Sequence, residues 1–202
     1  MIYAVDFDDY CDATVDTLEV LRDLREHHST FKVTLFAIPK RCSPFTIASA
    51  RALYPWLQLA PHGWRHTRGE CLGWTDEEAH AKLVAARDMG IDAPIFRAPG
   101  WLIDGDTYTA CSTLDYAIAS HSTYRIPHTG VREYVYNLRT PSTRQLRAIH
   151  GHLTPVAGNH IRDMLTDGRL TFATDSTFTH LPDIASVITA TPLEPTHAHP
   201  AP

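Results

Sequence analysis

Short runs of apolar residues alternate along this chain with segments in which apolar residues recur every three or four positions. Runs of four to eight residues rich in β-branched and aromatic side chains predict strands, and the wider spacing predicts helices. Strands are expected at residues 2–9, 31–39, 56–60, 94–98, 116–120, 131–138, 146–150 and 170–174. Helices are expected at residues 13–28, 44–53, 75–89, 106–114 and 156–165.

The helix expected at residues 75–89 carries signals for both of its ends. Thr75 and Glu78 match a capping box, in which a hydroxyl and an acid three residues later bind backbone N–H groups at a helix start. Gly90 is a typical stop, because glycine readily adopts the conformation that ends a helix.

Strands that alternate with helices predict βα units and a parallel sheet or barrel. The chain of 202 residues has the length of one domain. We expect residues 1–185 to form a single catalytic domain. Residues 186–202 are rich in proline and poor in apolar side chains, which predicts a disordered tail.

Charge and cysteine content exclude several classes of protein. The net charge is −5 and no segment concentrates lysine and arginine, which argues against nucleic acid or an anionic membrane as a partner. The first residues are acidic where a signal peptide needs an apolar run, and no segment reaches the ~18–20 apolar residues of a membrane span. We therefore expect a cytoplasmic protein. The cysteines are far apart, which favours reduced thiols over a zinc knuckle or a disulfide scaffold; they are Cys11, Cys42, Cys71 and Cys111.

Polar residues able to do chemistry gather where the expected strands end. The carboxyl ends of parallel strands meet at one rim, where α/β proteins build their active sites. The residues at this rim are Asp8, Asp9, His62, Arg97 and His150.

The acidic pair and the histidine pair can each be interpreted in two ways. Asp8 and Asp9 can cap the helix that follows, or one can bind a cation while the other accepts a proton. His62 and His66 are the only histidines in the chain spaced by four, although 13 histidines make one such pair expected by chance. Pro61 indicates that they lie on a loop, which can still bring both imidazoles to one metal ion.

The later motifs also have alternatives. Arg97 either forms a surface ion pair or holds a carboxylate and keeps it ionised. His150 either bonds to a loop carbonyl or takes part in the chemistry. His152 lies on the same face of an extended strand, so alternation alone does not separate it from His150.

Together the motifs D-F-D-D-Y, H-G-W-R-H, R-A-P-G-W and A-I-H, in this chain order, resemble the polysaccharide deacetylase family (NodB homology domain, carbohydrate esterase family 4). The resemblance covers residues 2 to about 175. It implies a distorted (β/α)7 barrel and a metal-dependent N-deacetylase that hydrolyses the amide of an N-acylated sugar or a small amide substrate. The implied cofactor is one divalent metal ion, for which Zn²⁺ is the simplest assignment.

The resemblance also assigns roles to residues. Asp8 is expected to be the general base, Arg97 its partner, and His150 the general acid, with His152 as the alternative. The metal ligands are expected to be Asp9, His62 and His66. Contacts with the substrate and its oxyanion are expected from Tyr10, Pro99, Gly100 and Trp101.

This sequence departs from the family pattern at several positions. Asp6 stands in place of the usual Thr or Ser, Tyr10 in place of Gly, and Gly63 in place of Ser or Thr. Gly100 occupies a position that is usually aromatic. No carboxylate in residues 116–121 is placed to orient the catalytic histidine, as an acidic residue does in the family.

Other functions fit parts of the pattern. The same fold can hydrolyse a small-molecule amide or cyclic amide, with or without a metal, or serve as a catalytically inactive carbohydrate-binding domain. Two histidines and one carboxylate also suit an Fe²⁺ oxygenase. The Asp8-Asp9 pair and Arg97 have no role in that chemistry.

Overall fold

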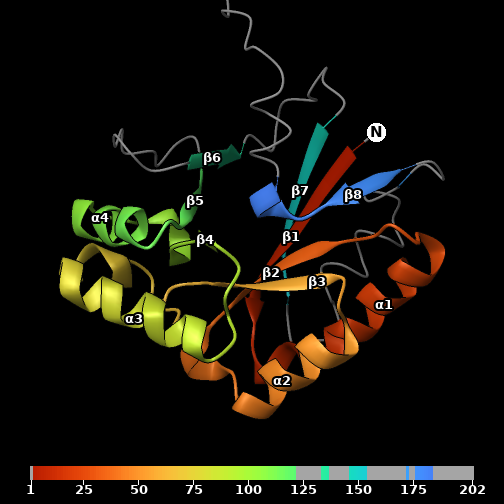
Figure 1. Cartoon of the computed structure of the whole chain (residues 1–202), viewed down its shortest axis with the longest axis horizontal. Coiled ribbons are helices and arrows are strands. Elements are labelled where there is room, and N and C mark those ends of the chain that lie inside the picture. Colours follow the sequence, from red (N-terminus) through yellow and green to blue (C-terminus); the bar gives the residue numbers. More distant parts are fainter. Residues whose placement is uncertain (1, 122–132, 137–145, 154–171, 173–175, 184–202) are drawn as a thin grey trace, which may run out of the picture.

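The structure is a computed structural model of the chain and describes residues 2–121, 133–136, 146–153, 172 and 176–183 (Figure 1). The helix expected at residues 156–165, most of the strand expected at 170–174 and the proline-rich tail lie outside the described residues.

Eight parallel strands form two sheets in the described parts of the chain. The larger sheet has the order β3-β2-β1-β7, and the smaller has the order β4-β5-β6. Their bounds are β1 Ile2–Tyr10, β2 Val33–Ala37, β3 Leu57–Pro61, β4 Ile95–Phe96, β5 Ala117–His121, β6 Glu133–Tyr136 and β7 Leu146–His152. The short strand β8, Thr177–Thr179, was not expected; it pairs with β1 at residues 2–4, ahead of the part that pairs with β2.

A parallel bridge between His62 and Arg97 joins the two sheets. The Arg97 N–H donates to the Pro61 carbonyl at 3.1 Å, and the Gly63 N–H donates to the Arg97 carbonyl at 3.1 Å. The strands therefore follow one another in chain order from β1 to β6, and β7 returns beside β1, which is the winding of a barrel. No pairing joins β6 to β7 within the described residues. The expected distorted (β/α)7 barrel is confirmed.

In the part of the chain that the structure describes, four α-helices lie along the outside of the strands (Figure 1). Their bounds are α1 Leu18–His27, α2 Pro44–Leu53, α3 Asp76–Asp88 and α4 Gly105–Thr113. The Thr75 hydroxyl caps α3 by accepting a hydrogen bond from the Glu78 N–H at 3.2 Å, which is the hydroxyl half of the expected capping box. The Glu78 carboxylate instead accepts a hydrogen bond from Lys82.

The first expected helix begins later than its apolar pattern indicates. Residues Asp12–Thr17 form a 3-10 helix, and α1 starts only at Leu18. The Thr14 hydroxyl accepts a hydrogen bond from the Cys11 N–H at 2.9 Å and lies 3.0 Å from the Asp9 carbonyl. Such bonds between a hydroxyl and nearby backbone groups compete with the α-helical pattern.

Alternation along the strands separates two faces. The outer faces of β1, β2 and β3 pack large apolar residues, Val5, Phe7 and Leu35 among them, in a cluster that includes α1 and α2 residues. A second cluster contains mainly small residues from the other face, with Ala4, Phe36, Ala60, Ile95, Ala117 and Ala119 among its members. These mainly small residues fill the inner face of the strands, and toward the carboxyl ends of the strands the inward-facing side chains are polar.

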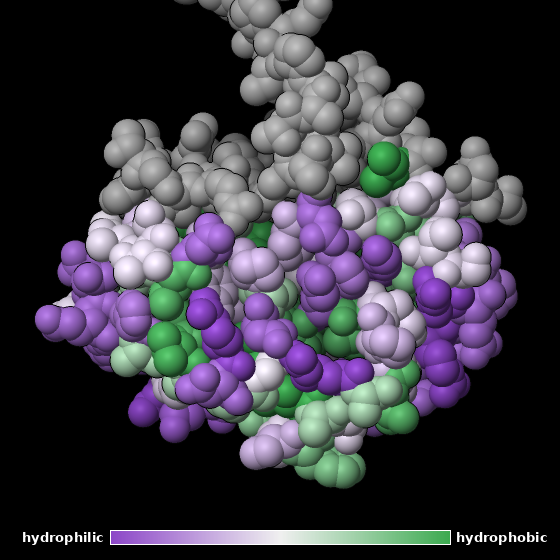
Figure 2. Space-filling view, in the orientation of Figure 1, coloured by the Kyte–Doolittle hydropathy of each residue, from purple (hydrophilic) through white to green (hydrophobic). Residues whose placement is uncertain are grey.

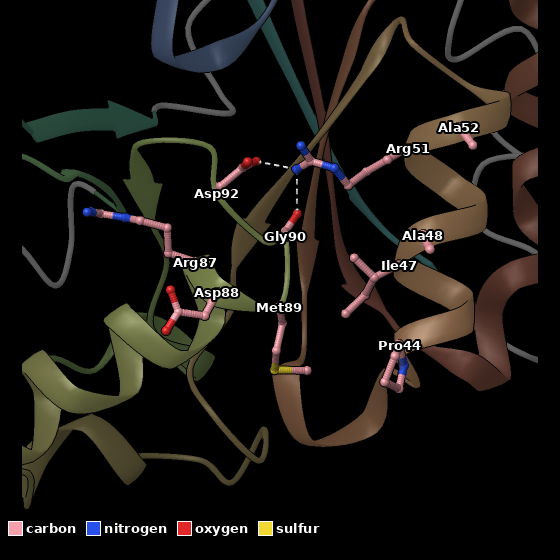
Figure 3. Close-up of a pocket in the computed structure, with 10 residues that line it drawn as sticks. All are labelled: Pro44, Ile47, Ala48, Arg51, Ala52, Arg87, Asp88, Met89, Gly90 and Asp92. Atoms are coloured by element: carbon pink, nitrogen blue, oxygen red, sulfur yellow. Dashed lines mark hydrogen bonds and ion pairs between the residues drawn. The ribbon is translucent and has the colours of Figure 1, made fainter.

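Hydrophilic residues cover much of the face seen in Figure 2, with hydrophobic residues between them. None of the helices in the described residues is long and apolar enough to cross a membrane. A depression lies between α2 and residues 87–92 (Figure 3), where Arg51 binds Asp92 at 2.6 Å. None of the residues expected to do chemistry lines it.

Candidate active site

A bulge in β1 turns two consecutive aspartates toward the same rim. Asp6 and Asp8 follow Ala4 on the inner face, because alternate residues of a strand share a face. The pairing with β2 then advances three residues on β1, from Phe7 to Tyr10, for two on β2. Asp9 takes a φ of +72°, a left-handed conformation that is costly outside glycine and is concentrated at functional sites. The bulge thus re-aims Asp9 toward the side chains at the end of β3.

Tyr10 lies elsewhere than the sequence led us to expect. Its ring is fully buried in the outer cluster, and its hydroxyl lies 3.4 Å from the Thr46 carbonyl. Burial raises the pKa of the Tyr10 phenol. Because the bulge uses one extra residue, Tyr10 points into the core and not toward a substrate, which corrects the expectation of a contact there.

Asp9, His62 and His66 form a candidate metal centre. One ligand atom from each lies within 4.8 Å of the other two. His66 Nε2 is 2.8 Å and His62 Nε2 is 3.8 Å from Asp9 Oδ1. Asp9 Oδ1 is buried and accepts no hydrogen bond from the described residues. A buried carboxylate oxygen without such a bond, facing two imidazole nitrogens, fits a divalent cation such as Zn²⁺.

The backbone of Arg97 fixes the orientation of His62. His62 Nδ1 is 3.0 Å from the Arg97 carbonyl oxygen, which can only accept, so Nδ1 carries the hydrogen. The lone pair of His62 then lies on Nε2, the atom that faces Asp9. Metal-binding histidines are held by such a second hydrogen bond in known sites.

Glu70, which the sequence analysis did not single out, holds the loop that carries both histidines. Its carboxylate accepts hydrogen bonds from the backbone N–H groups of Trp64 at 2.9 Å, Arg65 at 3.0 Å and His66 at 3.0 Å. Gly63 is required beside it, since a Cβ there would overlap Glu70 Oε1. The Gly63 departure from the family pattern is therefore coupled to Glu70.

Arg97 joins two carboxylates inside the barrel. Its Nη1 donates to Asp6 Oδ1 at 2.6 Å and to Asp8 Oδ1 at 2.5 Å, and all three side chains are almost fully buried. Its guanidinium also lies over the Phe36 ring, 3.8 Å from the centroid. Burial raises the pKa of Asp8, but Arg97 and the nearby His62 and His150 outweigh it, so the net pKa lies below the usual value.

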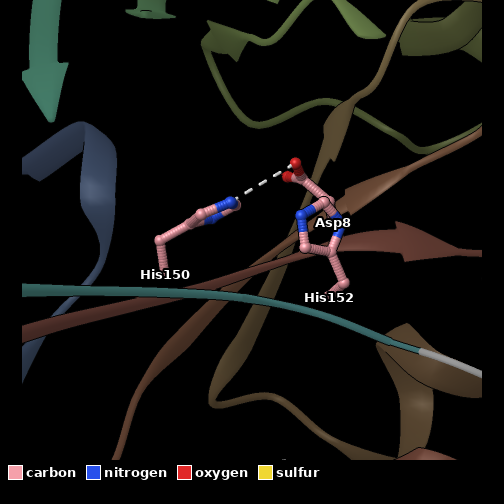
Figure 4. A group of neighbouring side chains, drawn as sticks. All are labelled: Asp8, His150 and His152. Atoms are coloured by element: carbon pink, nitrogen blue, oxygen red, sulfur yellow. Dashed lines mark ion pairs between the residues drawn. The ribbon is translucent and has the colours of Figure 1, made fainter. Parts of the chain in front are cut away.

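His150 and His152 come to this site from β7. The register of β1 and β7 places Asp6 opposite His150 and Asp8 opposite His152. His150 Nδ1 lies 2.8 Å from Asp6 Oδ1, and its Nε2 lies 3.7 Å from Asp8 Oδ2. Figure 4 shows both imidazoles near the Asp8 side chain, with the ring of His150 pointing toward its carboxylate.

His152 is the more exposed of the two histidines. Half of its side chain, 51%, is accessible, against 6% for His150. Its Nδ1 lies 2.9 Å from Asp9 Oδ2, the oxygen that does not face His66. The hydrogen bond to Asp9 raises the pKa of His152, with burial opposing it, and the same bond helps to hold the pKa of Asp9 low against the effect of burial.

Asp8, His150 and His152 form a second group with ligand atoms close enough for a metal ion. The Arg97 guanidinium lies 2.5 Å from Asp8, so a cation on this carboxylate would meet a positive charge at close range. The group built on Asp9 has no guanidinium contact of this kind in the described residues. We therefore take Asp9, His62 and His66 as the candidate metal ligands.

The segment after Arg97 turns sharply beside these groups. Gly100 and Trp101 have φ values of +66° and +64°. Pro99 is buried, while the Trp101 ring lies edge-on to His150 with 5.3 Å between centroids. The Trp101 N–H donates to the Ala98 carbonyl at 2.9 Å. Of the expected oxyanion donors, the backbone N–H of Gly100 remains the candidate.

Neither a protein-family model nor a curated protein matches the sequence. Solved structures do resemble it. A family 4 acetyl xylan esterase from Clostridium thermocellum, in complex with a cobalt ion, matches with a TM-score of 0.61 and 15% identity over 93% of this chain and 91% of that chain. Peptidoglycan deacetylase PdaC from Bacillus subtilis matches with 0.58 and 16% identity over 94% and 92%.

Two further structures bear on what this likeness means. The Xyl-CE4 domain of a multidomain xylanase from the hindgut metagenome of Trinervitermes trinervoides matches with a TM-score of 0.56 and 16% identity over 93% of this chain and 91% of that chain. A 4-alpha-glucanotransferase from Thermococcus litoralis matches with 0.61 and 9% identity over 92% of this chain and 40% of that chain. The chain therefore has the NodB-like fold of the family 4 carbohydrate esterases and polysaccharide deacetylases.

Proposed function

We propose that this protein is a metal-dependent hydrolase that removes an acetyl or other acyl group from the amide nitrogen of an N-acylated amino sugar or a related amide. The observation that carries the proposal is the position of Asp8 between the candidate metal centre and His150. Asp8 Oδ2 lies 3.7 Å from His62 Nε2 on one side and 3.7 Å from His150 Nε2 on the other.

The residues present fit a metal ion. Asp9, His62 and His66 would hold it, leaving positions open for water and substrate as catalytic zinc sites do. A divalent cation there would polarise the acyl carbonyl and lower the pKa of water.

The remaining residues divide the proton transfers between them. Asp8, kept ionised by Arg97, accepts a proton from the attacking water. The Gly100 N–H would donate a hydrogen bond to the oxyanion. His150 gives a proton to the leaving nitrogen, which an amine needs in order to depart. His152 contacts the carboxylate of Asp9 and is assigned no proton transfer.

The fold alone does not identify the reaction, because a glucanotransferase has a similar fold. Three structures of the same fold bear the names acetyl xylan esterase, Xyl-CE4 domain and peptidoglycan deacetylase, and one of them holds a cobalt ion. These names support the removal of acetyl groups from carbohydrate. The buried base and the histidine beside it favour this chemistry over an oxygenase, which uses neither.

Turnover and metal content together test the proposal. Purified protein should bind one zinc ion and release acetate from N-acetylglucosamine oligomers, measured with and without prior chelation. Acetate release that persists after the metal is removed would favour the metal-independent amide hydrolase. Protein that neither binds zinc nor releases acetate would favour the inactive carbohydrate-binding domain.

A further inference from the structure

The buried carboxylate of Asp6 has no counterpart in the motif pattern, and the proposed reaction gives it no part. Its position on β1 is usually Thr or Ser in the family that the sequence resembles. The side chain is 0% exposed, and both of its described polar contacts go to one oxygen, Oδ1. One of these contacts is His150 Nδ1 at 2.8 Å, and the other is Arg97 Nη1 at 2.6 Å.

We infer that Asp6 is the positioning residue of His150, the acidic partner that residues 116–121 do not provide. The inference rests on the proposed function for what His150 does, and on the structure for where Asp6 lies. The register of β1 and β7 places the two residues opposite each other on neighbouring strands. Strand β1 therefore carries both the base, Asp8, and the residue that positions the acid, Asp6.

The geometry decides which atom carries the hydrogen. Arg97 Nη1 also lies 3.0 Å from His150 Nδ1, so Nδ1 could in principle accept from Arg97. In that tautomer Nδ1 carries no hydrogen and is an acceptor, as Asp6 Oδ1 is. Two lone pairs would then face each other across 2.8 Å, which is unfavourable. Nδ1 therefore donates to Asp6. Arg97 and His150 converge on the same oxygen as two donors.

This hydrogen bond directs His150 Nε2 toward the reaction. As the C–N bond breaks, its electron pair moves to the nitrogen, which takes the proton from His150 Nε2. The imidazole is left neutral with its remaining hydrogen on Nδ1, still donated to Asp6. Without Asp6 the ring is free to hold its hydrogen on the wrong nitrogen, and a carboxylate that fixes the tautomer of a catalytic histidine contributes up to about 10⁴-fold to turnover.

Substrates with different leaving groups distinguish a residue that positions the acid from one that only stabilises the fold. Asp6→Ala and His150→Ala should each lower release of acetate from an N-acetyl amide by about 10²-fold or more. The double variant should lose no more than either single variant, because both remove one function. With 4-nitrophenyl acetate, whose leaving group needs no proton, Asp6→Ala should retain its rate within about threefold. Multiplicative losses in the double variant, or equal loss on both substrates with zinc still bound, would overturn the inference.

Two further measurements keep the inference testable if Asp6→Ala does not fold. Asp6→Asn keeps the shape of the side chain and an acceptor oxygen but removes the charge, and it should show an intermediate loss on the amide. Nitrogen-15 NMR of the histidine rings in the wild-type protein, assigned with His150→Gln, should show hydrogen on Nδ1 of His150. Hydrogen on Nε2 alone in neutral His150 would refute the assignment. A wild-type protein that shows the Nδ1 hydrogen but deacylates nothing would refute the proposed function and leave the placement intact.

Discussion

The imidazole of His62 is bonded through Nδ1 to the backbone carbonyl of Arg97, the residue whose side chain pairs with Asp6 and Asp8. The same two residues form the bridge between the sheets. Arg97 therefore contacts both parts of the site, the candidate metal ligand His62 through its backbone and the carboxylates of Asp6 and Asp8 through its side chain.

We expect His62→Ala to abolish zinc binding and turnover together. Loss of an outer partner of a metal ligand costs about 10–100-fold in affinity, so loss of the ligand itself should exceed about 100-fold. Isothermal titration with Zn²⁺ measures the change. His27→Ala, on the exposed end of α1, is the control and should bind normally. Full zinc affinity in His62→Ala would show that the ligand assignment is wrong.

Asp8→Asn should separate metal binding from catalysis. The amide cannot accept the proton from water, so turnover should fall by at least about 10²–10⁴-fold. Zinc affinity should fall by no more than about 10–100-fold, which is the loss expected for a residue that contacts a ligand without binding the metal itself. Asp16→Asn, an exposed aspartate, serves as the control. Loss of zinc binding equal to that in His62→Ala would instead make Asp8 a ligand.

Glu70→Gln should weaken zinc binding without removing a ligand. The carboxylate accepts three backbone hydrogen bonds from residues 64–66, and the neutral amide offers only one oxygen to them. We expect the zinc affinity to fall by about 10–100-fold, as for other partners that orient ligands. Glu77→Gln, in the exposed first turn of α3, should leave the affinity unchanged.

Gly63→Ala should destabilise the protein and displace the histidine loop. The glycine has a φ of +58°, and the new Cβ would lie 2.6 Å from Pro99 Cγ and closer still to Glu70. A left-handed conformation alone costs an alanine about 1–2 kcal/mol. Chemical denaturation should show at least this loss. Gly73→Ala is a matched control, since no atom lies within 4 Å of the added carbon.

The stability of the protein should fall as the pH drops below 6.5, in part because of His180. Burial lowers the pKa of His180 below its usual value of 6.5, and the ammonium of Lys32 acts in the same direction. Below pH 6.5 the unfolded chain takes up a proton that the folded protein resists, so unfolding becomes easier. One such group contributes at most about 1.4 kcal/mol per pH unit.

Urea unfolding at pH 7.5 and pH 5.5 measures this contribution. His180→Gln keeps a donor for the Val33 carbonyl, which lies 3.2 Å from His180 Nδ1, and it should show a smaller loss of stability at pH 5.5 than the wild type. His27→Gln should behave as the wild type does. An unchanged pH dependence in His180→Gln would contradict the assignment.

The residues at the rim of the barrel could be predicted from the sequence, because the ends of strands follow from local patterns. Helix α2 has the expected bounds, and Asp8, His62 and Arg97 lie at strand ends as their positions indicated. What it missed depends on register and on loop closure. Nothing in the pattern shows that Asp6 lies opposite His150, that a bulge sends Tyr10 to the core, or that Glu70 reaches back to residues 64–66.

One signal could have identified Asp6 earlier. It shares the face of Asp8 by simple alternation, so a charged residue there had to lie inside the barrel and find a partner. Arg97 was the only arginine or lysine already expected at the rim. The pairing with the histidine of β7 still required the register, which a single sequence does not contain.

Strand β1 carries the base, one candidate ligand and the proposed partner of the acid within nine residues, and it lies between β2 and β7. Dissociation of this strand from the sheet would separate the base, the candidate ligand and the partner of the acid from the rest of the site in one step. We therefore expect no partly unfolded form to retain turnover, and the denaturant concentration that ends activity should coincide with the one that melts the central sheet.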